Sequence, residues 1–413
     1  MRIGFLGAIS AASVMIAGTA WAQAAPPAPE TEMGRLAAAM QPGEMRELPT
    51  KHCTRDLFRM WYDWEEDDIK RYGSQKMFDI ICWNNDMKWD PGTRQILVIN
   101  GGHYSSFKFI TYSADTNEWR LMPVPPWMDP RRPDSTACGK DGKDGNRSWP
   151  RSHLYDRLAI SPEHRLFAVN FNGLYLYDID KQDWTPRIPT SSGGKDAYQV
   201  IEYFPEMKAF IYECNWGRDL RLWDVEKKEE RRLGSYPFGM HGVMEYNPVH
   251  KVMLFGAGDA GGGEGKGHPS LYLLNKEGTV AKLKPPPIHI NCTPRSKLLC
   301  DPASGEYIAQ DRGDGRFHAF HPIRDEWKEL PGLRLPDAES LGAAIDTYGV
   351  MMFLSRGKAG FRCHLYKHKP AFGEEAAFPG FTEAKAFQGC RIPAIVLAQK
   401  GTVLAGLPGD AAK

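Results

Sequence analysis

A short tag ending in proline recurs along the chain and constrains its fold more than any other feature. Each copy has two or three strand-type residues, then proline, then a turn and an apolar run. Five copies end at Pro91, Pro162, Pro205, Pro248 and Pro302. A sixth copy, Ala344-Ile345-Asp346-Thr347-Tyr348, lacks the proline. A sequence that repeats in this way indicates a ring or stack of similar units, each opening with a hairpin.

Two more strands are expected after each hairpin. The fourth often opens with tryptophan, as in Asn117-Glu118-Trp119, Asp183-Trp184 and Glu326-Trp327. Four short antiparallel strands in about 45 residues are typical of a propeller blade. The 41 Gly and 31 Pro residues suit many tight turns. The sequence therefore predicts an all-β chain with one six-bladed β-propeller, and a degenerate seventh blade using residues 395–397 is the alternative.

The sixth unit lacks a fourth strand of its own. Residues 44–49 match residues 326–331, the fourth strand of the fifth unit, at four of six positions. An N-terminal strand that completes the last blade would close the ring and remove an exposed sheet edge. Residues 54–73 are expected to be helical.

The N-terminus predicts export. Arg2 precedes an uncharged apolar stretch, and Ala20-Trp21-Ala22 is a suitable cleavage site. We expect a signal peptide at residues 1–22, a disordered lead-in at 23–40, the propeller at 41–400 and a tail at 401–413. The blades themselves are expected at about 80–370. The mature protein would be periplasmic or secreted, with no membrane span.

The charge and the cysteine content further restrict the partners, disulfides and metal sites that the protein can have. The net charge is +1, with no basic block, which argues against a nucleic-acid partner. Eight cysteines in an exported chain predict one to three disulfides. The pairs nearest in sequence are Cys292–Cys300 and Cys363–Cys390. No C-x-x-C motif is present, so zinc-ribbon and c-haem sites are not expected.

Three motifs resemble those of secreted bacterial kelch-like propellers of the galactose-oxidase-type superfamily. They are Gly101-Gly102-His103, Thr116-Asn117-Glu118-Trp119 and Arg151-Ser152-His153-Leu154-Tyr155-Asp156. The resemblance covers roughly residues 80–370 and implies the propeller fold. Copper chemistry of the galactose-oxidase kind would need two Tyr and two His ligands and an added C-terminal domain, so a copper oxidoreductase is the least favoured reading.

One register position suggests where chemistry could occur. Seven residues before each tag proline stand Asn84, Tyr155, Tyr198, His241 and Arg295, and counting back from Tyr348 gives Leu341. First strands line a propeller's central channel, so this ring of polar side chains is the predicted site. The alternative is a polar channel wall that binds ordered water.

The loops between second and third strands and the blade starts add candidates on the same face. Trp216 could stack on a sugar ring, and the arginines could hold a carboxylate. The added substrate-binding candidates are His103, Tyr104, His153, Asn215, Trp216, Arg218, Arg312 and Arg356. Residues 256–269 form a glycine-rich loop that is interpreted as a flexible lid.

These residues favour a carbohydrate-active enzyme, a lyase acting on uronic-acid glycans by β-elimination. Tyr198 or His241 would be the base and Tyr155 the acid, while Asn84, Arg218 and Arg295 would hold the carboxylate. A glycoside hydrolase is the next choice, with Glu213, Asp259 and Asp311 as available carboxylates. A non-catalytic scaffold that binds glycan or protein is the alternative. No cofactor is expected, and a structural or substrate-bridging metal ion is left open.

Overall fold

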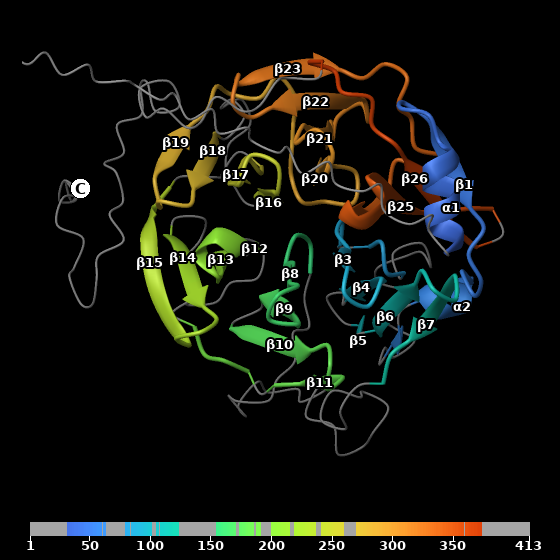
Figure 1. Ribbon diagram of the computed structural model, residues 1–413, viewed down its shortest axis with the longest axis horizontal. Coiled ribbons are helices and arrows are strands. Elements are labelled where there is room, and N and C mark those ends of the chain that lie inside the picture. The colour runs from blue at the N-terminus through green and yellow to red at the C-terminus, as the bar shows by residue number, and fades with distance from the viewer. Residues whose placement is uncertain are drawn as a thin grey trace, which may run out of the picture.

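The computed structural model describes residues 31–59, 61–62, 79–82, 84–100, 105–106, 108–123, 154–170, 173–185, 187–190, 200–214, 219–236, 241–259, 270–358 and 360–373. Within these residues, six four-stranded antiparallel sheets stand around a common axis as a β-propeller (Figure 1). The predicted fold class is therefore confirmed. The signal-peptide region, residues 395–397 and the tail lie outside the described residues.

In blades one to five the strands run in chain order from the axis outward. Blade one contains β3 (Lys88–Asp90), β4 (Gln95–Asn100), β6 (Lys108–Ser113) and β7 (Glu118–Leu121). Blade two contains β8 (Leu158–Ser161), β9 (Leu166–Asn170), β10 (Leu174–Asp178) and β11 (Asp183–Trp184). Blade three contains β12 (Ile201–Phe204), β13 (Ala209–Cys214), β14 (Asp219–Asp224) and β15 (Glu229–Ser235).

The second half of the ring repeats this order. Blade four contains β16 (Val243–Asn247), β17 (Val252–Gly256), β18 (Leu271–Asn275) and β19 (Val280–Lys282). Blade five contains β20 (Lys297–Cys300), β21 (Tyr307–Gln310), β22 (Phe317–His321) and β23 (Glu326–Glu329). Blade six contains β24 (Ser340–Ile345), β25 (Val350–Arg356) and β26 (Phe361–Tyr366), and its outer strand is β1 (Met45–Leu48).

The tag forms the same hairpin in successive blades. In blades one and four the residue before the proline caps the turn: Asp90 accepts the N–H of Thr93 at 3.0 Å, and Asn247 accepts the N–H of His250 at 3.0 Å. A left-handed residue then directly precedes the second strand. In five blades this residue is Arg94, Arg165, Lys208, Lys251 or Gly349, with φ between 50 and 62°.

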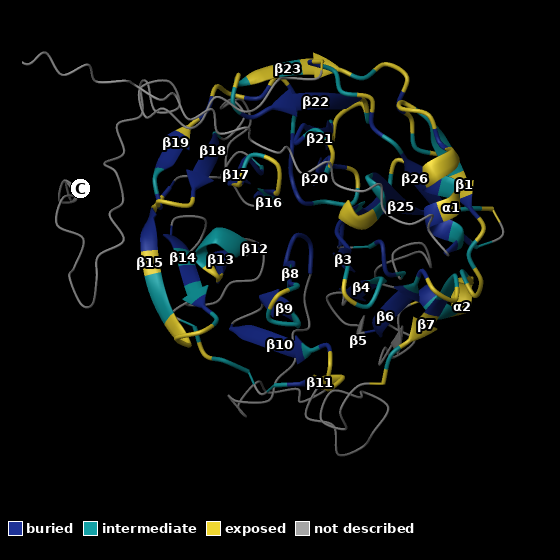
Figure 2. Ribbon diagram, viewed as in Figure 1, coloured by how far each residue is buried: buried dark blue, intermediate teal, exposed yellow. Residues whose placement is uncertain are grey.

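The recurrent tryptophan has a packing role. It stands opposite an aromatic residue of the third strand, as in Tyr112–Trp119, Tyr177–Trp184 and Phe320–Trp327. The ring centroids of these pairs are 5.3, 5.2 and 4.4 Å apart. Such cross-strand aromatic pairs stabilise the otherwise short outer strands. Most residues of the inner three strands are buried, and exposed residues gather at the outer edges (Figure 2).

The N-terminal strand closes the ring as predicted. β1 pairs antiparallel with β26, with Met45 opposite Tyr366 and Leu48 opposite Cys363. In Figure 1 the first strand of the chain lies beside the last. The last blade is thus held by segments from both ends of the described chain.

Two expectations about the N-terminal region are corrected. Part of the supposed disordered lead-in forms α1 (Glu32–Ala39), because Thr31 caps it and Met33 and Ala37 are buried against the propeller. Among the described residues of the helix expected over residues 54–73, only a single turn, α2 (Arg55–Phe58), is helical. The backbone becomes extended at Arg59 and continues as β2 (Trp61–Tyr62), which pairs with β5 (Ser105–Ser106). Residues 63–73 lie outside the described residues.

The structure tests the expected disulfides only in part. Cys292 and Cys300, one of the two pairs nearest in sequence, are both free and buried, in separate strand and loop environments, so these two cysteines are not bonded to each other. Cys363 is free as well, and its neighbour is Cys53. Cys390 lies outside the described residues. In the described part of the chain, no helix has the length and apolar character needed to cross a membrane.

Candidate active site at the axial mouth

The sixth position of the polar ring is Glu339, two residues before Leu341, which counting back from Tyr348 selects. The turns η4 (Pro205–Met207) and η5 (Asp346–Tyr348) occupy equivalent places, each followed by a left-handed residue and then the second strand. Asp346 therefore stands where the other blades carry proline, and seven residues earlier is Glu339. Leu341 lies within β24 and is fully buried.

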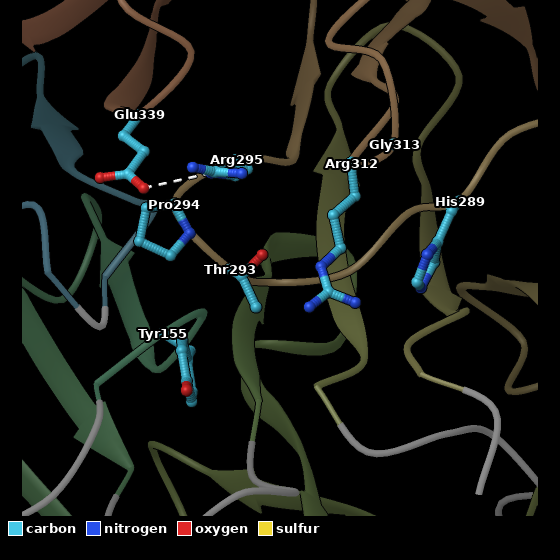
Figure 3. A pocket seen from close by; sticks show the side chains of 8 residues that line it. All are labelled: Tyr155, His289, Thr293, Pro294, Arg295, Arg312, Gly313 and Glu339. Atoms are coloured by element: carbon cyan, nitrogen blue, oxygen red, sulfur yellow. Dashed lines mark hydrogen bonds and ion pairs between the residues drawn. The ribbon is translucent and has the colours of Figure 1, made fainter. Parts of the chain in front are cut away.

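Three ring residues surround a pocket at one mouth of the axis. This mouth pocket has a volume of about 530 Å³ and is lined by Tyr155, His289, Thr293, Pro294, Arg295, Arg312, Gly313 and Glu339. Figure 3 shows Tyr155 on one side of the opening and Arg312 and His289 on the other, with Arg295 paired to Glu339. Tyr155, Arg295 and Glu339 come from segments that enter first strands, and Arg312 follows a second strand. The sequence predicts that the segments entering first strands and the loops after second strands meet on one face, and residues of both kinds line this pocket.

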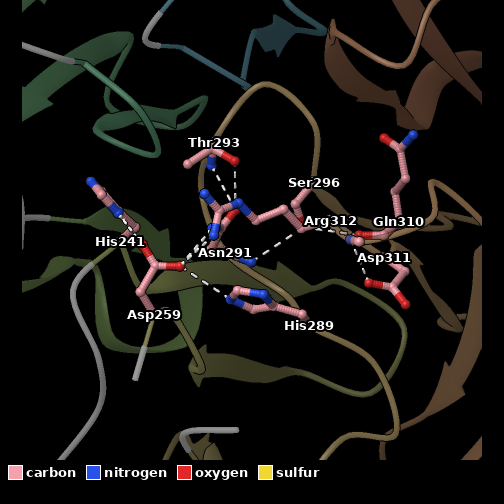
Figure 4. Close-up of polar contacts among 10 residues, drawn as sticks. His241, Asp259, His289, Asn291, Thr293, Ser296, Gln310, Asp311 and Arg312 are labelled. Carbon is pink, nitrogen blue, oxygen red and sulfur yellow. Dashed lines mark hydrogen bonds and ion pairs between the residues drawn. The ribbon is translucent and has the colours of Figure 1, made fainter. Parts of the chain in front are cut away.

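Asp259 binds four side chains beside this pocket. Its Oδ2 accepts from His241 Nδ1 at 2.6 Å. Its Oδ1 accepts from His289 Nε2 at 3.1 Å, Asn291 Nδ2 at 3.0 Å and an Arg312 nitrogen at 3.0 Å (Figure 4). We call these five residues the Asp259 cluster. They come from blades four and five.

The backbone after β17 explains how Asp259 reaches this place. Gly256, Ala257 and Gly258 are consecutive left-handed residues, with φ of 116, 53 and 95°. The N–H of Gly258 donates to the carbonyl of Ile290 at 2.9 Å, which fixes the turn against the segment that carries His289 and Asn291. A Cβ on Gly256 would stand 2.5 Å from the Ser270 carbonyl oxygen, so this position requires glycine.

The Asp259 carboxylate is ionised at neutral pH. Burial alone would raise its pKa, but hydrogen bonds from His241 and Asn291 and the charge of Arg312 lower the pKa to about 2. A carboxylate can only accept hydrogen bonds, so His241 must carry its proton on Nδ1. In the neutral ring, Nε2 is then the atom with a lone pair.

His241 is held in an unusual backbone conformation next to Tyr155. Its φ is 62°, which few non-glycine residues adopt, and its carbonyl accepts the N–H of Cys292 at 3.0 Å. Its ring meets that of Tyr155 edge to face, with centroids 4.6 Å apart. Burial raises the pKa of Tyr155, so its hydroxyl keeps its proton at neutral pH. The two predicted catalytic residues within the described chain are thus in contact.

The arginines that line the pocket are already paired with acids. Arg295 Nε lies 3.2 Å from Glu339, yet the Arg295 side chain is 66% exposed. Arg312 is 41% exposed and pairs with Asp259. Because both guanidiniums remain open to solvent, a ligand anion could add to these ion pairs.

Two predicted ligand-binding residues lie in structural positions instead. Arg356 holds Asp79 through two hydrogen bonds of 2.6 and 2.9 Å and also pairs with Glu339. Asn84 is fully buried and bonds to the carbonyl of Ile99. The remaining candidates lie outside the described residues: Tyr198, His103, Tyr104, His153, Asn215, Trp216 and Arg218.

Several site residues were not found from the sequence. The sequence offers Asp259 only as an available carboxylate for a glycoside hydrolase, and it predicts no role for His289, Asn291 or Thr293. Counting back seven residues from Asp346, which is equivalent to the tag prolines, rather than from Tyr348, reaches Glu339. Nothing in the sequence shows that the loop after β17 folds back onto the segment before β20.

The described residues contain no group of three or more His, Cys, Asp or Glu side chains arranged to hold a metal. His241 and His289 both donate to Asp259 rather than pointing at a shared centre. His153 and His268 lie outside the described residues.

The opposite mouth of the axis contains a buried ionic network. Lys88 Nζ lies 2.6 Å from Glu202, 2.9 Å from Asp86 and 3.7 Å from Glu245. We call these four residues, with Asp156, the axial cluster. They come from blades one to four and lie beside a second pocket of about 320 Å³. The cluster joins several blades at the centre of the ring.

A six-bladed β-propeller with a polar pocket at one mouth of its axis is the class of molecule that these observations define. No protein-family model matches the chain, and no curated protein matches it. Three solved structures illustrate what it resembles. The first is a hydrazine synthase chain from Kuenenia stuttgartiensis, 15% identical with a TM-score of 0.43, covering 68% of this chain and 76% of that one.

The second is a chain of the mitotic checkpoint complex, 9% identical with a TM-score of 0.41, covering 79% of this chain and 94% of that one. The third is TolB from Acinetobacter baumannii, 12% identical with a TM-score of 0.35, covering 66% of each chain. These likenesses are too distant to support any functional inference.

Proposed function

We propose that the protein is an exported carbohydrate-active enzyme, a lyase that cleaves uronic-acid-containing glycans by β-elimination at the mouth pocket. One observation carries the proposal: His241 is oriented by Asp259 at 2.6 Å and contacts Tyr155 at the edge of a pocket lined by two solvent-open arginines. This arrangement supplies a base, an acid and cations within one site.

The proposed reaction begins with proton transfer to His241. Nε2 takes the proton from the carbon next to the uronate carboxylate, and the C–H electron pair forms the new carbon–carbon double bond as the glycosidic C–O bond breaks. The leaving oxygen takes a proton from the Tyr155 hydroxyl. The imidazolium that forms stands beside the Asp259 carboxylate, which stabilises its charge.

Arg295 and Arg312 would neutralise the uronate carboxylate while negative charge develops on it. Both side chains line the mouth pocket and are partly exposed. Trp216 and Arg218 keep their proposed roles in sugar stacking and carboxylate binding. Asn84 is not included, because its buried amide is bonded within blade one.

The test is a screen of the purified full-length protein on uronic-acid polysaccharides. The ultraviolet absorbance of the unsaturated product reports elimination directly. We expect product from at least one polymer, with a loss of roughly 10²-fold or more in kcat for His241→Ala and Tyr155→Phe. His164→Ala is the matched control, because His164 lies beyond the mouth pocket and bonds to Ser161. Absence of product on every polymer would remove the lyase proposal.

A glycan-binding scaffold without chemistry is the second candidate. It is favoured by the ion pairs Arg295–Glu339 and Arg312–Asp259, which already satisfy the pocket arginines. For this candidate, binding to an acidic oligosaccharide should fall in Arg312→Ala and persist in His241→Ala, without any unsaturated product. Arg316→Ala, on the same loop but paired with Asp314, is the control for Arg312→Ala.

We also propose that the protein is exported and that it is related to kelch-like propellers. Export rests on the residue 1–22 pattern, and N-terminal sequencing of the protein recovered from a secreting host tests it. The kinship rests on the Gly101-Gly102-His103 and Asn117-Glu118-Trp119 motifs.

A further inference from the structure

Two thiols meet at the seam where the propeller ring closes. Cys363 lies on β26, opposite Leu48 of the closing strand β1. Cys53 lies in the segment that follows β1, and its Sγ is 3.9 Å from that of Cys363. The N–H of Phe361, also on β26, donates to the Cys53 carbonyl at 3.4 Å. The backbone itself therefore holds the two cysteines side by side.

We propose that Cys53 and Cys363 are a redox-active pair whose oxidation forms a disulfide that joins the N-terminal segment covalently to the last blade. The two sulfurs lie 3.9 Å apart, and a disulfide requires them to approach to about 2 Å. The proposal concerns the seam of the ring and does not depend on the function proposed for the mouth pocket.

A small-molecule disulfide such as oxidised glutathione is the oxidant class. The thiolate of one cysteine attacks a sulfur of this disulfide, which forms a mixed disulfide and releases one thiol. The second cysteine then loses its proton and attacks the protein sulfur of the mixed disulfide, which releases the second thiol. Two electrons and two protons pass in total from the cysteines to the small molecule.

Accessibility indicates which cysteine reacts first. Cys363 is 1% exposed, whereas Cys53 is half-buried. Interaction with Cys363 lowers the pKa of Cys53, and burial raises the pKa of Cys363. Cys53 is thus the better attacking thiol, and Cys363 is the one that completes the bond.

The bond would link residues 310 apart in sequence, so it would restrict nearly the whole ring in the unfolded chain. A crosslink that closes so long a loop should raise the melting temperature by roughly 5–8 °C. The same bond would hold β1 on the last blade and prevent the ring from opening at its seam.

The experiment equilibrates the full chain in oxidised and in reduced glutathione, then maps peptides by mass spectrometry without reduction. We expect a Cys53–Cys363 crosslinked peptide from the oxidised sample alone. The melting temperature should rise on oxidation in the wild type and in Cys82→Ser, a control that removes a thiol outside the pair. It should not rise in Cys53→Ser.

Peptide mapping of the wild type keeps the test independent of how well any variant folds. If Cys53 and Cys363 both remain alkylatable after oxidation, or if either is found crosslinked to another cysteine instead, the proposal is wrong. An equal rise in melting temperature in Cys53→Ser would also contradict it.

Discussion

Asp259 matters at the residue scale because four donors converge on its two oxygens. Asp259→Asn removes the charge and turns an amide donor toward these donors. We expect a loss of about 1–2 kcal/mol of stability at pH 7, after allowance for partial exposure. Urea denaturation measures it. If the proposed reaction holds, kcat should also fall roughly 10²–10⁴-fold, because the His241 tautomer is no longer fixed.

The pH dependence tests whether the charge of Asp259 is responsible. Its folded pKa of about 2 lies below the ordinary value of 3.8. The stabilisation is therefore complete above pH 4 and is lost as the pH falls from 4 toward 2. The gap between wild type and Asp259→Asn should narrow over that window. Asp314→Asn, at an exposed carboxylate of blade five, should change little. A gap that stays constant with pH would exclude the charge as the cause.

The sequence could predict some of these residues and not others, for a physical reason. Tyr155 and His241 occupy a register position that every blade repeats, so counting along the chain reaches them. Asp259 depends on three successive left-handed residues after β17, and Asn291 lies in an irregular segment before β20. Asp259 and Asn291 come into contact through the tertiary packing of two loops, and a periodic sequence pattern cannot predict such packing.

At the scale of elements, β1 should contribute strongly to stability because it is the outer strand of the last blade. Leu48 is 1% exposed and faces the core, whereas Glu47 is half exposed on the opposite face. Leu48→Ala should cost about 2–4 kcal/mol of unfolding free energy. Glu47→Ala is the matched control and should cost little. Equal, small effects of the two substitutions would show that the closing strand adds no stability.

The blades themselves could be predicted because local chemistry and tertiary structure agree in them. Asp90 and Asn247 cap the same turn, and each fourth-strand tryptophan pairs with a third-strand aromatic residue. The one-turn helix α2 and the β2–β5 pair could not be predicted in this way. The sequence after Arg55 has a helical pattern, but Phe58 packs on Phe361 of the last blade and Trp61–Tyr62 pair with β5, so the described part of this segment is helical for only one turn.

At the scale of the whole molecule, the axis joins the blades through charge as well as apolar packing. The axial cluster sets four carboxylates around Lys88 in a buried space. Burial raises the pKa of Asp86 to about 7 and also raises those of Asp156 and Glu245. One lysine cannot balance four ionised acids, so protons complete the charge balance at the centre of the ring.

This arrangement predicts how Asp86→Asn alters stability with pH. Wild-type Asp86 ionises near pH 4 when unfolded but near pH 7 when folded, so the folded state binds more protons in between. Its contribution to stability therefore falls as the pH rises from 4 to 7. Asn carries no such proton, so Asp86→Asn should become progressively more stable relative to wild type across that window. Urea denaturation at pH 4, 5.5, 7 and 8 measures the difference, and a constant or shrinking difference would show that Asp86 is ionised throughout.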